Sequence, residues 1–267
     1  MNGPSQLNDD TPVLECRGVE RRFGGLVALS GVDLRIARGE IFGLVGPNGS
    51  GKTTLTNAIT GFYPPQKGQV LLQGQDITGL APHKVARRGV ARTFQNLALF
   101  NGMSVLDNIL LGRHVHMNPG VFRTLGYWVA ARQEETANRD IVEEVIRFMQ
   151  LESVREEMVD SIPIGLKKRV ELARALVAEP SFLILDEPMA GMNQEEKEYM
   201  ARFVLDARDE RGVTVLLIEH HMDIITGICD RVLVLSYGEM IGTGVPAEII
   251  ADPRVIKAYL GTAHVAR

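Results

Sequence analysis

The sequence has few cysteines and no excess of basic residues. Cys16 and Cys229 are its only cysteines. They are far apart, which excludes a disulfide framework and a cysteine metal site, and their scarcity suits a reducing cytosol. Asp plus Glu number 33 against 29 for Lys plus Arg, a net charge of −4. Nucleic-acid binders neutralise phosphates with surplus basic side chains, so this composition argues against nucleic acid as a partner.

Long hydrophobic runs are also missing. No apolar stretch approaches the roughly 18 residues that suggest a membrane-spanning helix. The first ten residues are polar and lack the basic and apolar regions of a signal peptide. We therefore expect a soluble protein with a flexible tail at residues 1–12, so that any membrane role depends on a partner. Hydrophobic residues make up 45% of the chain, enough for a large buried core.

Short apolar segments bounded by glycine and charged residues predict strands. Residues 32–36 alternate apolar and charged side chains, whereas residues 41–45 are apolar throughout, as in a buried strand. Further strand candidates lie at residues 69–72, 89–94, 182–185, 213–218 and 231–235. Helical patterns separate them, and strands that alternate with helices indicate an α/β fold around a mostly parallel sheet.

The middle of the chain has a different pattern. Ile141, Val145 and Met149 recur every fourth residue, which predicts an amphipathic helix, and strand signals are absent around it. We read this region as an inserted α-helical subdomain, with residues 112–132 as an additional insertion of undetermined form. The expected division is an α/β core at residues 13–100 and 175–250, a helical subdomain at 101–174 and a C-terminal tail at 251–267.

One glycine-rich segment carries the clearest chemistry. Gly46-Pro47-Asn48-Gly49-Ser50-Gly51-Lys52-Thr53 fits the phosphate-binding pattern G-x-x-x-x-G-K-[ST] between an apolar strand and a helix. Backbone amides of such a loop face the phosphates, and the helix N-terminus adds its positive dipole end. We expect residues 46–54, including Thr54, to bind ATP, with Lys52 on the β- and γ-phosphates and the Thr53 hydroxyl on Mg²⁺. The alternative, a glycine-rich turn before a basic helix, is disfavoured by this context.

A second motif supplies two acids. Residues 182–185 are apolar and are followed by Asp186 and Glu187. A buried strand can hold Asp186 rigidly near the metal, which it contacts through water. Glu187 is then placed to orient and deprotonate an attacking water. The alternative is that both acids cap a helix before Pro188, a reading with little weight beside a phosphate loop.

With these two motifs, residues 14–261 resemble the nucleotide-binding subunits of ABC transporters. The resemblance implies a P-loop NTPase core of the ABC ATPase type, with an N-terminal antiparallel β portion, and ATP hydrolysis coupled to transport. It also implies that Gln95 touches the metal, that His220 contacts the γ-phosphate, that Phe23 stacks on adenine and that Asn193 lies near a dimer interface. Singly, each has an ordinary alternative, such as a strand-end amide, a surface histidine or a core aromatic. Their order along the chain favours the family.

The signature motif departs from this family. ABC ATPases usually carry a Leu-Ser-Gly-Gly-Gln type sequence that contacts the γ-phosphate on the opposite subunit, and residues 162–166 here read Ile-Pro-Ile-Gly-Leu. Pro163 has neither a hydroxyl nor a backbone N–H, so two donors are missing. Gly165 and the helix dipole remain. We expect the basic run at residues 167–169 to be mostly a solvated helix face, the alternative being that it replaces the lost donors.

Several segments are similar to the ATPases of branched-chain amino-acid importers, namely residues 22–29, 92–95, 190–193 and 252–261. This similarity implies a peripheral subunit on the cytoplasmic face of the inner membrane that uses ATP and Mg²⁺. It implies a second ABC ATPase, in a heterodimer or alternatively a homodimer, two permeases and an extracytoplasmic binding protein. The alternatives are a related system for urea, amides or lipid export, and a regulatory ATP switch, which Glu187 disfavours. Residues 97–100 are either helical-subdomain core or the floor of a permease groove.

Overall fold

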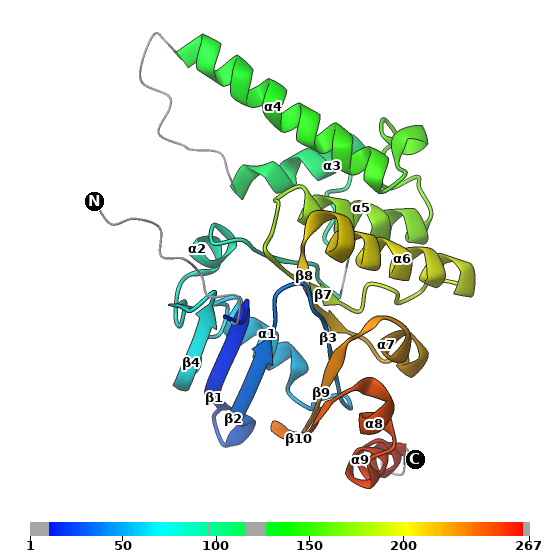
Figure 1. Cartoon of the computed structure of the whole chain (residues 1–267). Helices are drawn as coiled ribbons and strands as arrows, with labels where there is room; N and C mark the ends of the chain where they lie inside the picture. Colours follow the sequence, from blue (N-terminus) through cyan, green and yellow to red (C-terminus); the bar gives the residue numbers. More distant parts are fainter. Residues whose placement is uncertain (1–10, 96, 116–126, 264–267) are drawn as a thin grey trace.

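A computed structural model describes residues 11–95, 97–115 and 127–263 of the chain. Two sheets form the core, and a layer of helices covers one side of it (Figure 1). Most of the expected N-terminal tail lies outside the described residues, as does the central part of the insertion expected at residues 112–132. None of the helices in the described ranges is long and apolar enough to cross a bilayer.

The smaller sheet is antiparallel, as the family resemblance implies. It has the strand order β2-β1-β4-β5. Its strands are β1 (Leu14–Phe23), β2 (Leu26–Ile36), β4 (Lys67–Leu72) and β5 (Gln75–Asp76). Val32, Leu34 and Ile36 of β2 are buried while Asp33 and Arg35 are exposed, which confirms the predicted half-buried strand.

The larger sheet is parallel except for its last strand. Its order is β10-β9-β3-β8-β7-β6, and only β9 and β10 pair antiparallel. The strands are β3 (Ile41–Val45), β6 (Val90–Arg92), β7 (Phe182–Asp186), β8 (Thr214–Ile218), β9 (Arg231–Ser236) and β10 (Glu239–Gly244). Every residue of β3, β7 and β8 is buried, which confirms the apolar runs as central strands. The carboxyl ends of these parallel strands meet at one edge, where ligands of α/β proteins bind.

Helices connect the strands and form the subdomain. They are α1 (Lys52–Ile59), α2 (Pro82–Ala86), α3 (Val105–Leu110), η1 (Leu111–Val115), α4 (Tyr127–Phe148), η2 (Glu152–Val154), α5 (Ile164–Leu176), α6 (Gln194–Arg211), α7 (Met222–Ile228), α8 (Pro246–Ile250) and α9 (Pro253–Ala263). Helices α3, α4 and α5 lie together on one side of the core (Figure 1). Of the residues that set the four-residue period, Val145 and Met149 are fully buried and Ile141 is partly buried.

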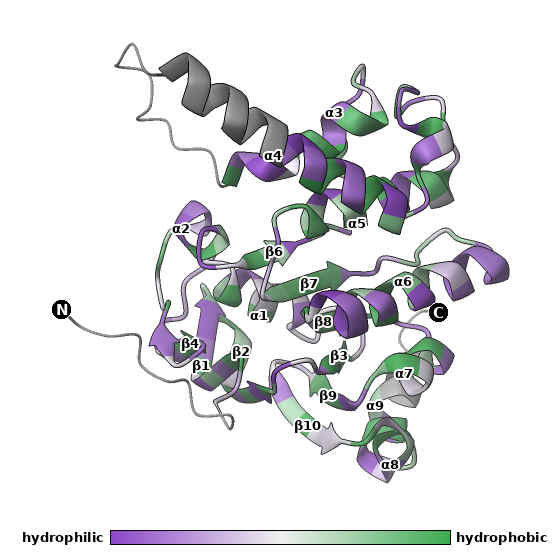
Figure 2. Cartoon of the chain, turned by 45° about the horizontal axis from the view of Figure 1, so that its top comes forward, coloured by the Kyte–Doolittle hydropathy of each residue, from purple (hydrophilic) through white to green (hydrophobic). Residues whose placement is uncertain are grey.

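The central strands divide the hydrophobic core into two clusters. Leu183 and Leu217 face a cluster shared with the helical subdomain and α6. Their chain neighbours Ile184 and Leu216 face a second cluster, which is shared with α1 and the antiparallel sheet. Side chains alternate between the two faces of a strand, so β7 and β8 hold both layers together. In Figure 2, β7 is hydrophobic along its length, while α6 carries many hydrophilic residues.

The end of the chain differs from the sequence-based expectation. Instead of a tail from residue 251, helix α9 runs from Pro253 to Ala263. Val255 is only 2% exposed and belongs to the hydrophobic cluster that contains β9 residues. One apolar anchor therefore fixes the helix against the core. The last four residues lie outside the described ranges.

Replacing Leu217 in the centre of β8 with alanine should destabilise the whole domain. Leu217 is fully buried, and removing a buried leucine side chain costs about 2–5 kcal/mol. Urea unfolding measures the loss. Ile256→Ala is the control, because Ile256 is 44% exposed and its truncation should cost no more than about 0.5 kcal/mol. Equal losses from both variants would contradict the assigned core.

Candidate nucleotide-binding site

The predicted phosphate loop joins β3 to α1 at the carboxyl edge of the larger sheet. Close backbone approaches require glycine at two of its positions, Gly46 and Gly51. A Cβ at Gly46 would lie 2.2 Å from the carbonyl oxygen of Leu235, and one at Gly51 would lie 2.7 Å from that of Ala28. Gly51 also has a φ of 109°, which side chains disfavour, directly before the first turn of α1. The loop therefore presents backbone amides where larger residues could not fit.

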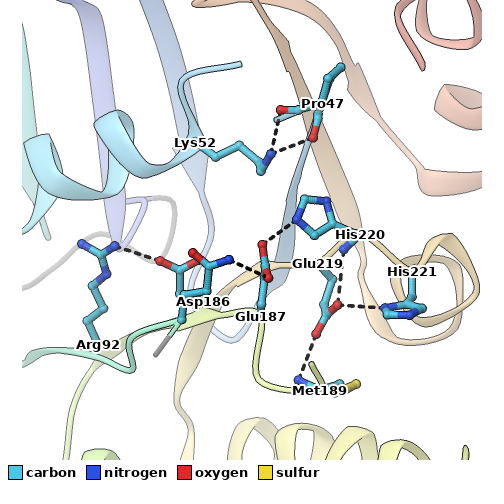
Figure 3. Close-up of polar contacts among 11 residues, drawn as sticks. Pro47, Lys52, Arg92, Asp186, Glu187, Met189, Glu219, His220 and His221 are labelled. Atoms are coloured by element: carbon cyan, nitrogen blue, oxygen red, sulfur yellow. Dashed lines mark hydrogen bonds and ion pairs between the residues drawn. The ribbon is translucent and has the colours of Figure 1, made fainter. Parts of the chain in front are cut away.

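Lys52 lies folded over this loop. Its Nζ donates to the carbonyl oxygen of Gly46 at 2.7 Å and to that of Pro47 at 3.0 Å, the latter shown in Figure 3. Burial lowers the pKa of Lys52, while the negative charges of Glu187 and Asp186 partly oppose that shift. A cation held in this desolvated place is suited to anionic phosphate oxygens. The neighbouring Ser50 Oγ is buried and has no hydrogen-bond partner within the described ranges.

A pocket opens in front of the loop and gathers most of the predicted ATP-binding residues. Its lining includes Phe23, Asn48, Gly49, Ser50, Gly51, Lys52, Thr53, Thr54, Gln95, Asp186 and Glu187. Phe23 is 40% exposed and packs edge-on against Tyr63, with ring centroids 5.6 Å apart. It is thus a pocket aromatic and not a core residue. Tyr237 also lines the pocket, although no motif in the sequence marked it.

Asp186 ends β7 in a buried ion pair. Its Oδ2 lies 2.8 Å from Nη2 of Arg92, and both side chains are at most 10% exposed. The Nη1 of Arg92 donates to Asn57 of α1 at 2.7 Å. Arg92, the last residue of β6, therefore contacts both the Asp186 carboxylate and helix α1, which follows the phosphate loop. The segment Arg92–Gln95 was already singled out in the sequence, but the ion pair itself required the three-dimensional neighbours.

Glu187 brings two other predicted residues together. Its Oε1 lies 2.5 Å from Nε2 of His220 (Figure 3). Its Oε2 accepts a hydrogen bond from Nε2 of Gln95 at 3.1 Å. Its backbone has a φ of 51°, an uncommon conformation of the kind that clusters at functional sites. The backbone N–H of Glu187 donates to Ile218 at the end of β8, at 2.9 Å. The acid is thereby held at the edge of the sheet with its carboxylate directed to the pocket.

The oxygen atoms of the pocket match one class of metal ion. The Thr53 hydroxyl, the Gln95 side-chain carbonyl and the Asp186 carboxylate all belong to residues that line it. Such hard oxygen donors, few in number, are typical of Mg²⁺ sites completed by water and substrate phosphates. The three residues expected to serve the metal are thus brought to one place.

The signature residues lie elsewhere, at the start of α5. Pro163 is the N-cap of this helix and makes no side-chain capping bond. A Cβ at Gly165 would lie 2.3 Å from Oε1 of Glu196, so the carboxylate of Glu196 rests against this helix end. Asn193 caps α6 in the same region through reciprocal 2.9 Å hydrogen bonds with Glu196. Within the described ranges, none of these residues lines the nucleotide pocket.

The basic run after the signature is not a solvated face, and that expectation is wrong for two of its three residues. Lys168 is only 5% exposed, and its Nζ lies 3.5 Å from the carbonyl oxygen of Gln95. Arg169 bonds to carbonyl oxygens at the end of α4, and its guanidinium lies 4.9 Å from the Phe203 ring centroid. Helix α5 packs on several sides, so long cationic side chains extend to internal carbonyls. These cations do not replace the missing signature donors.

Comparisons with known proteins agree with this geometry. The family model described as "ABC transporter" matches residues 29–190, and one described as "Branched-chain amino acid ATP-binding cassette transporter" matches residues 239–265. The chain is 39% identical to the high-affinity branched-chain amino acid transport ATP-binding protein BraF of Pseudomonas aeruginosa, over 94% of the chain and 99% of that protein. It is 38% identical to LivG of Escherichia coli K12, with the same coverage.

Solved structures show the same fold. A nucleotide-free ATP-binding cassette from an ABC transporter superimposes with a TM-score of 0.81 at 30% identity, covering 93% of this chain and 98% of that one. The ADP conformation of an ATP-binding cassette gives the same TM-score and identity, covering 94% and 99%.

Replacing Lys52 with alanine should remove most ATP binding, because the site loses its buried cation. A charged hydrogen bond to phosphate contributes about 1.5–3 kcal/mol, so the dissociation constant should rise by about 10- to 100-fold. Equilibrium binding of a fluorescent ATP analogue measures it. Lys67→Ala is the control, since the Lys67 side chain is 72% exposed and pairs with Glu20 on the antiparallel sheet. Undiminished binding by the Lys52 variant would contradict the site.

Proposed function

The chain belongs to the ABC transporter family of ATP-binding subunits, and from that premise we propose that it powers uptake of branched-chain amino acids across the cytoplasmic membrane. It hydrolyses ATP to ADP and phosphate and couples the reaction to transport. Support for the substrate class comes from its similarity to BraF and LivG over nearly their full length. The match at residues 239–265 to the branched-chain amino acid cassette family points the same way.

The observation that carries the catalytic part is the placement of Glu187 between Gln95 and His220. In the proposed step, a water oxygen bonds to the γ-phosphorus while the bond from that phosphorus to the β-bridging oxygen breaks. The Glu187 carboxylate takes the proton of the water, and ADP is the leaving group. His220 orients Glu187 and stabilises charge on the transferred phosphoryl group.

The remaining residues of the pocket bind and orient the substrate. Lys52 and the amides of the phosphate loop contact the β- and γ-phosphates. Phe23 stacks on adenine from the exposed side of the pocket. When bound by Thr53, Gln95 and, through water, Asp186, Mg²⁺ supplies charge neutralisation to the phosphates. Arg92 keeps the Asp186 carboxylate in one orientation at the metal position.

We infer further that this subunit pairs with a different ABC ATPase. Each ATP of such a dimer lies between the phosphate loop of one subunit and the signature of the other. Here the signature has Pro163 in place of a donor and the Glu196 carboxylate against Gly165. Negative charge at this helix end opposes a trans γ-phosphate. A partner with a complete signature would therefore form the faster site with Lys52 and Glu187 of this chain.

A cavity between the core and the helical subdomain supports a permease contact. It is lined by residues of α2, β6 and α5, including Glu171 and Arg174 of α5, and by Phe62 and Phe94 from the loops after α1 and β6. Of the two alternatives for residues 97–100, Leu99 packs partly on the subdomain core, whereas Phe100 is 55% exposed. We propose that a cytoplasmic helix of the permease occupies this groove beside Phe100. A binding protein outside the membrane completes the importer.

Replacing Glu187 with glutamine in the reconstituted transporter should nearly abolish both ATP hydrolysis and leucine uptake, because the general base is lost. General-base catalysis contributes about 10²- to 10⁴-fold. The corresponding change in the partner ATPase alone should cost much less, since that site is completed by Pro163 and Gly165. Equal losses from the two changes would contradict the asymmetry. A wild-type complex that transports urea and no leucine would overturn the substrate assignment.

A cysteine at position 100 should cross-link to a cysteine in a cytoplasmic permease loop. The two native cysteines should not form cross-links, because burial raises the pKa of Cys16 and of Cys229 to about 12. Mass spectrometry of the product locates the partner position. Tyr199→Cys on α6 is the control, with similar exposure of 49% but on another face. No product with Phe100→Cys during turnover would remove the groove assignment.

A further inference from the structure

Glu219 is a buried acid that the proposed chemistry does not use. It follows β8 directly and is only 1% exposed, and it does not line the nucleotide pocket as Glu187 and Asp186 do. Its carboxylate accepts hydrogen bonds from two loops. Oε1 accepts from the backbone N–H of Met189 at 3.1 Å, and Oε2 accepts from that of His220 at 3.3 Å (Figure 3). One side chain therefore joins the loop after Glu187 to the loop that carries His220.

A third contact extends this link to α6. Oε2 of Glu219 lies 3.4 Å from Nδ1 of His221, and Nε2 of His221 lies 3.1 Å from Nζ of Lys197. A lysine ammonium only donates, so Nε2 must accept and the imidazole proton is on Nδ1. The Nδ1–H group of His221 then donates a hydrogen bond to Oε2 of Glu219. The resulting chain of donors, from Lys197 through His221 to Glu219, ends on the carboxylate.

These contacts constrain the position of His220. A buried carboxylate is stable only when its oxygens receive hydrogen bonds, and charged acceptors bind amides more strongly than neutral ones. Movement of the Met189 loop relative to the His220 loop would break the hydrogen bond from Met189 to Glu219 and leave Oε1 without that donor. The Nε2 of His220 in turn lies 2.5 Å from Glu187. His220 belongs to one of these loops and Glu187 directly precedes the other. Holding the two loops at a fixed distance therefore also fixes the distance between His220 and Glu187.

We propose that Glu219 is a positioning residue for ATP hydrolysis, which holds the His220 loop and the loop at residues 187–192 in register. The inference rests on the roles proposed for Glu187 and His220. It adds that the loop containing Met189, which precedes the α6 cap Asn193, and the loop containing His220 move as one unit. A displacement of the residues near Asn193 is then transmitted through Glu219 to Glu187 and His220.

The test compares Glu219→Gln with Glu40→Gln in the reconstituted transporter. Glutamine keeps the size of Glu219, but its amide nitrogen cannot accept from one of the two backbone N–H groups. We expect kcat for ATP hydrolysis to fall about tenfold or more, with KM for ATP changed by less than about twofold, because misplaced catalytic groups slow the chemical step. Glu40 is a matched control: it is 7% exposed, accepts from the backbone N–H of Ala37 at 2.7 Å, and precedes β3 at the end opposite the phosphate loop. Its variant should lose thermal stability and keep kcat within about twofold.

A double-mutant cycle separates positioning from general destabilisation. If Glu219 acts through His220, then Glu219→Gln should cause no additional loss of kcat in a His220→Ala background. Additive losses, or an unchanged kcat in Glu219→Gln alone, would overturn the inference. Should Glu219→Gln fail to fold, His221→Ala replaces it, because the His221 side chain is 44% exposed. That variant should lower kcat about twofold to fivefold, again only when His220 is present, and an unchanged kcat would refute the link.

Failure of this inference can be told apart from failure of the proposed function. Loss of ATP binding in Lys52→Ala and loss of turnover in Glu187→Gln test the site itself. If both losses are observed and Glu219→Gln hydrolyses ATP normally, only the role of Glu219 is refuted. If Glu187→Gln is fully active, the premise of the inference fails as well.

Discussion

Two adjacent carboxylates leave the end of β7, and the arrangement of the site depends on how their charges are balanced. Asp186 is paired with Arg92 in surroundings that exclude most water. Glu187 has no guanidinium among its described hydrogen-bond partners and is held instead by Gln95 and His220. A paired acid is fixed and available to a metal, while a weakly compensated acid can accept a proton. Different partners therefore give neighbouring acids different roles.

The parallel sheet makes this arrangement possible. β3, β7 and β8 are buried at every residue, so their positions are set by packing on both faces. The phosphate loop, the two acids and the His220 loop each begin where one of these strands ends. A shift of one strand along its neighbour would separate Glu187 from Ile218, whose carbonyl oxygen accepts the Glu187 N–H at 2.9 Å. Core packing is thus the source of precision at the pocket.

Strand positions and the phosphate loop could be predicted from the sequence because both are local patterns. Apolar runs mark buried strands, and the loop motif has fixed spacing. The strands β1, β5 and β10 were missed. The residues of β10, Glu-Met-Ile-Gly-Thr-Gly, show neither alternation nor an apolar run. Contacts between distant residues were harder to predict. Arg92 and Asp186 are 94 positions apart, and only the parallel pairing of β6 with β7 brings them together. The burial of Lys168 likewise results from the packing of helix α5, and residues 167–169 alone do not predict it.

The contact between Gly165 and Glu196 bears on how this signature region could change in evolution. A side chain at position 165 would require the Glu196 carboxylate to move, and that carboxylate takes part in the capping box at the start of α6. Position 163 has no such restriction, because Pro163 is exposed. A hydroxyl gained at position 163 would therefore leave the start of α6 undisturbed, whereas a side chain gained at position 165 would also disturb the cap of α6.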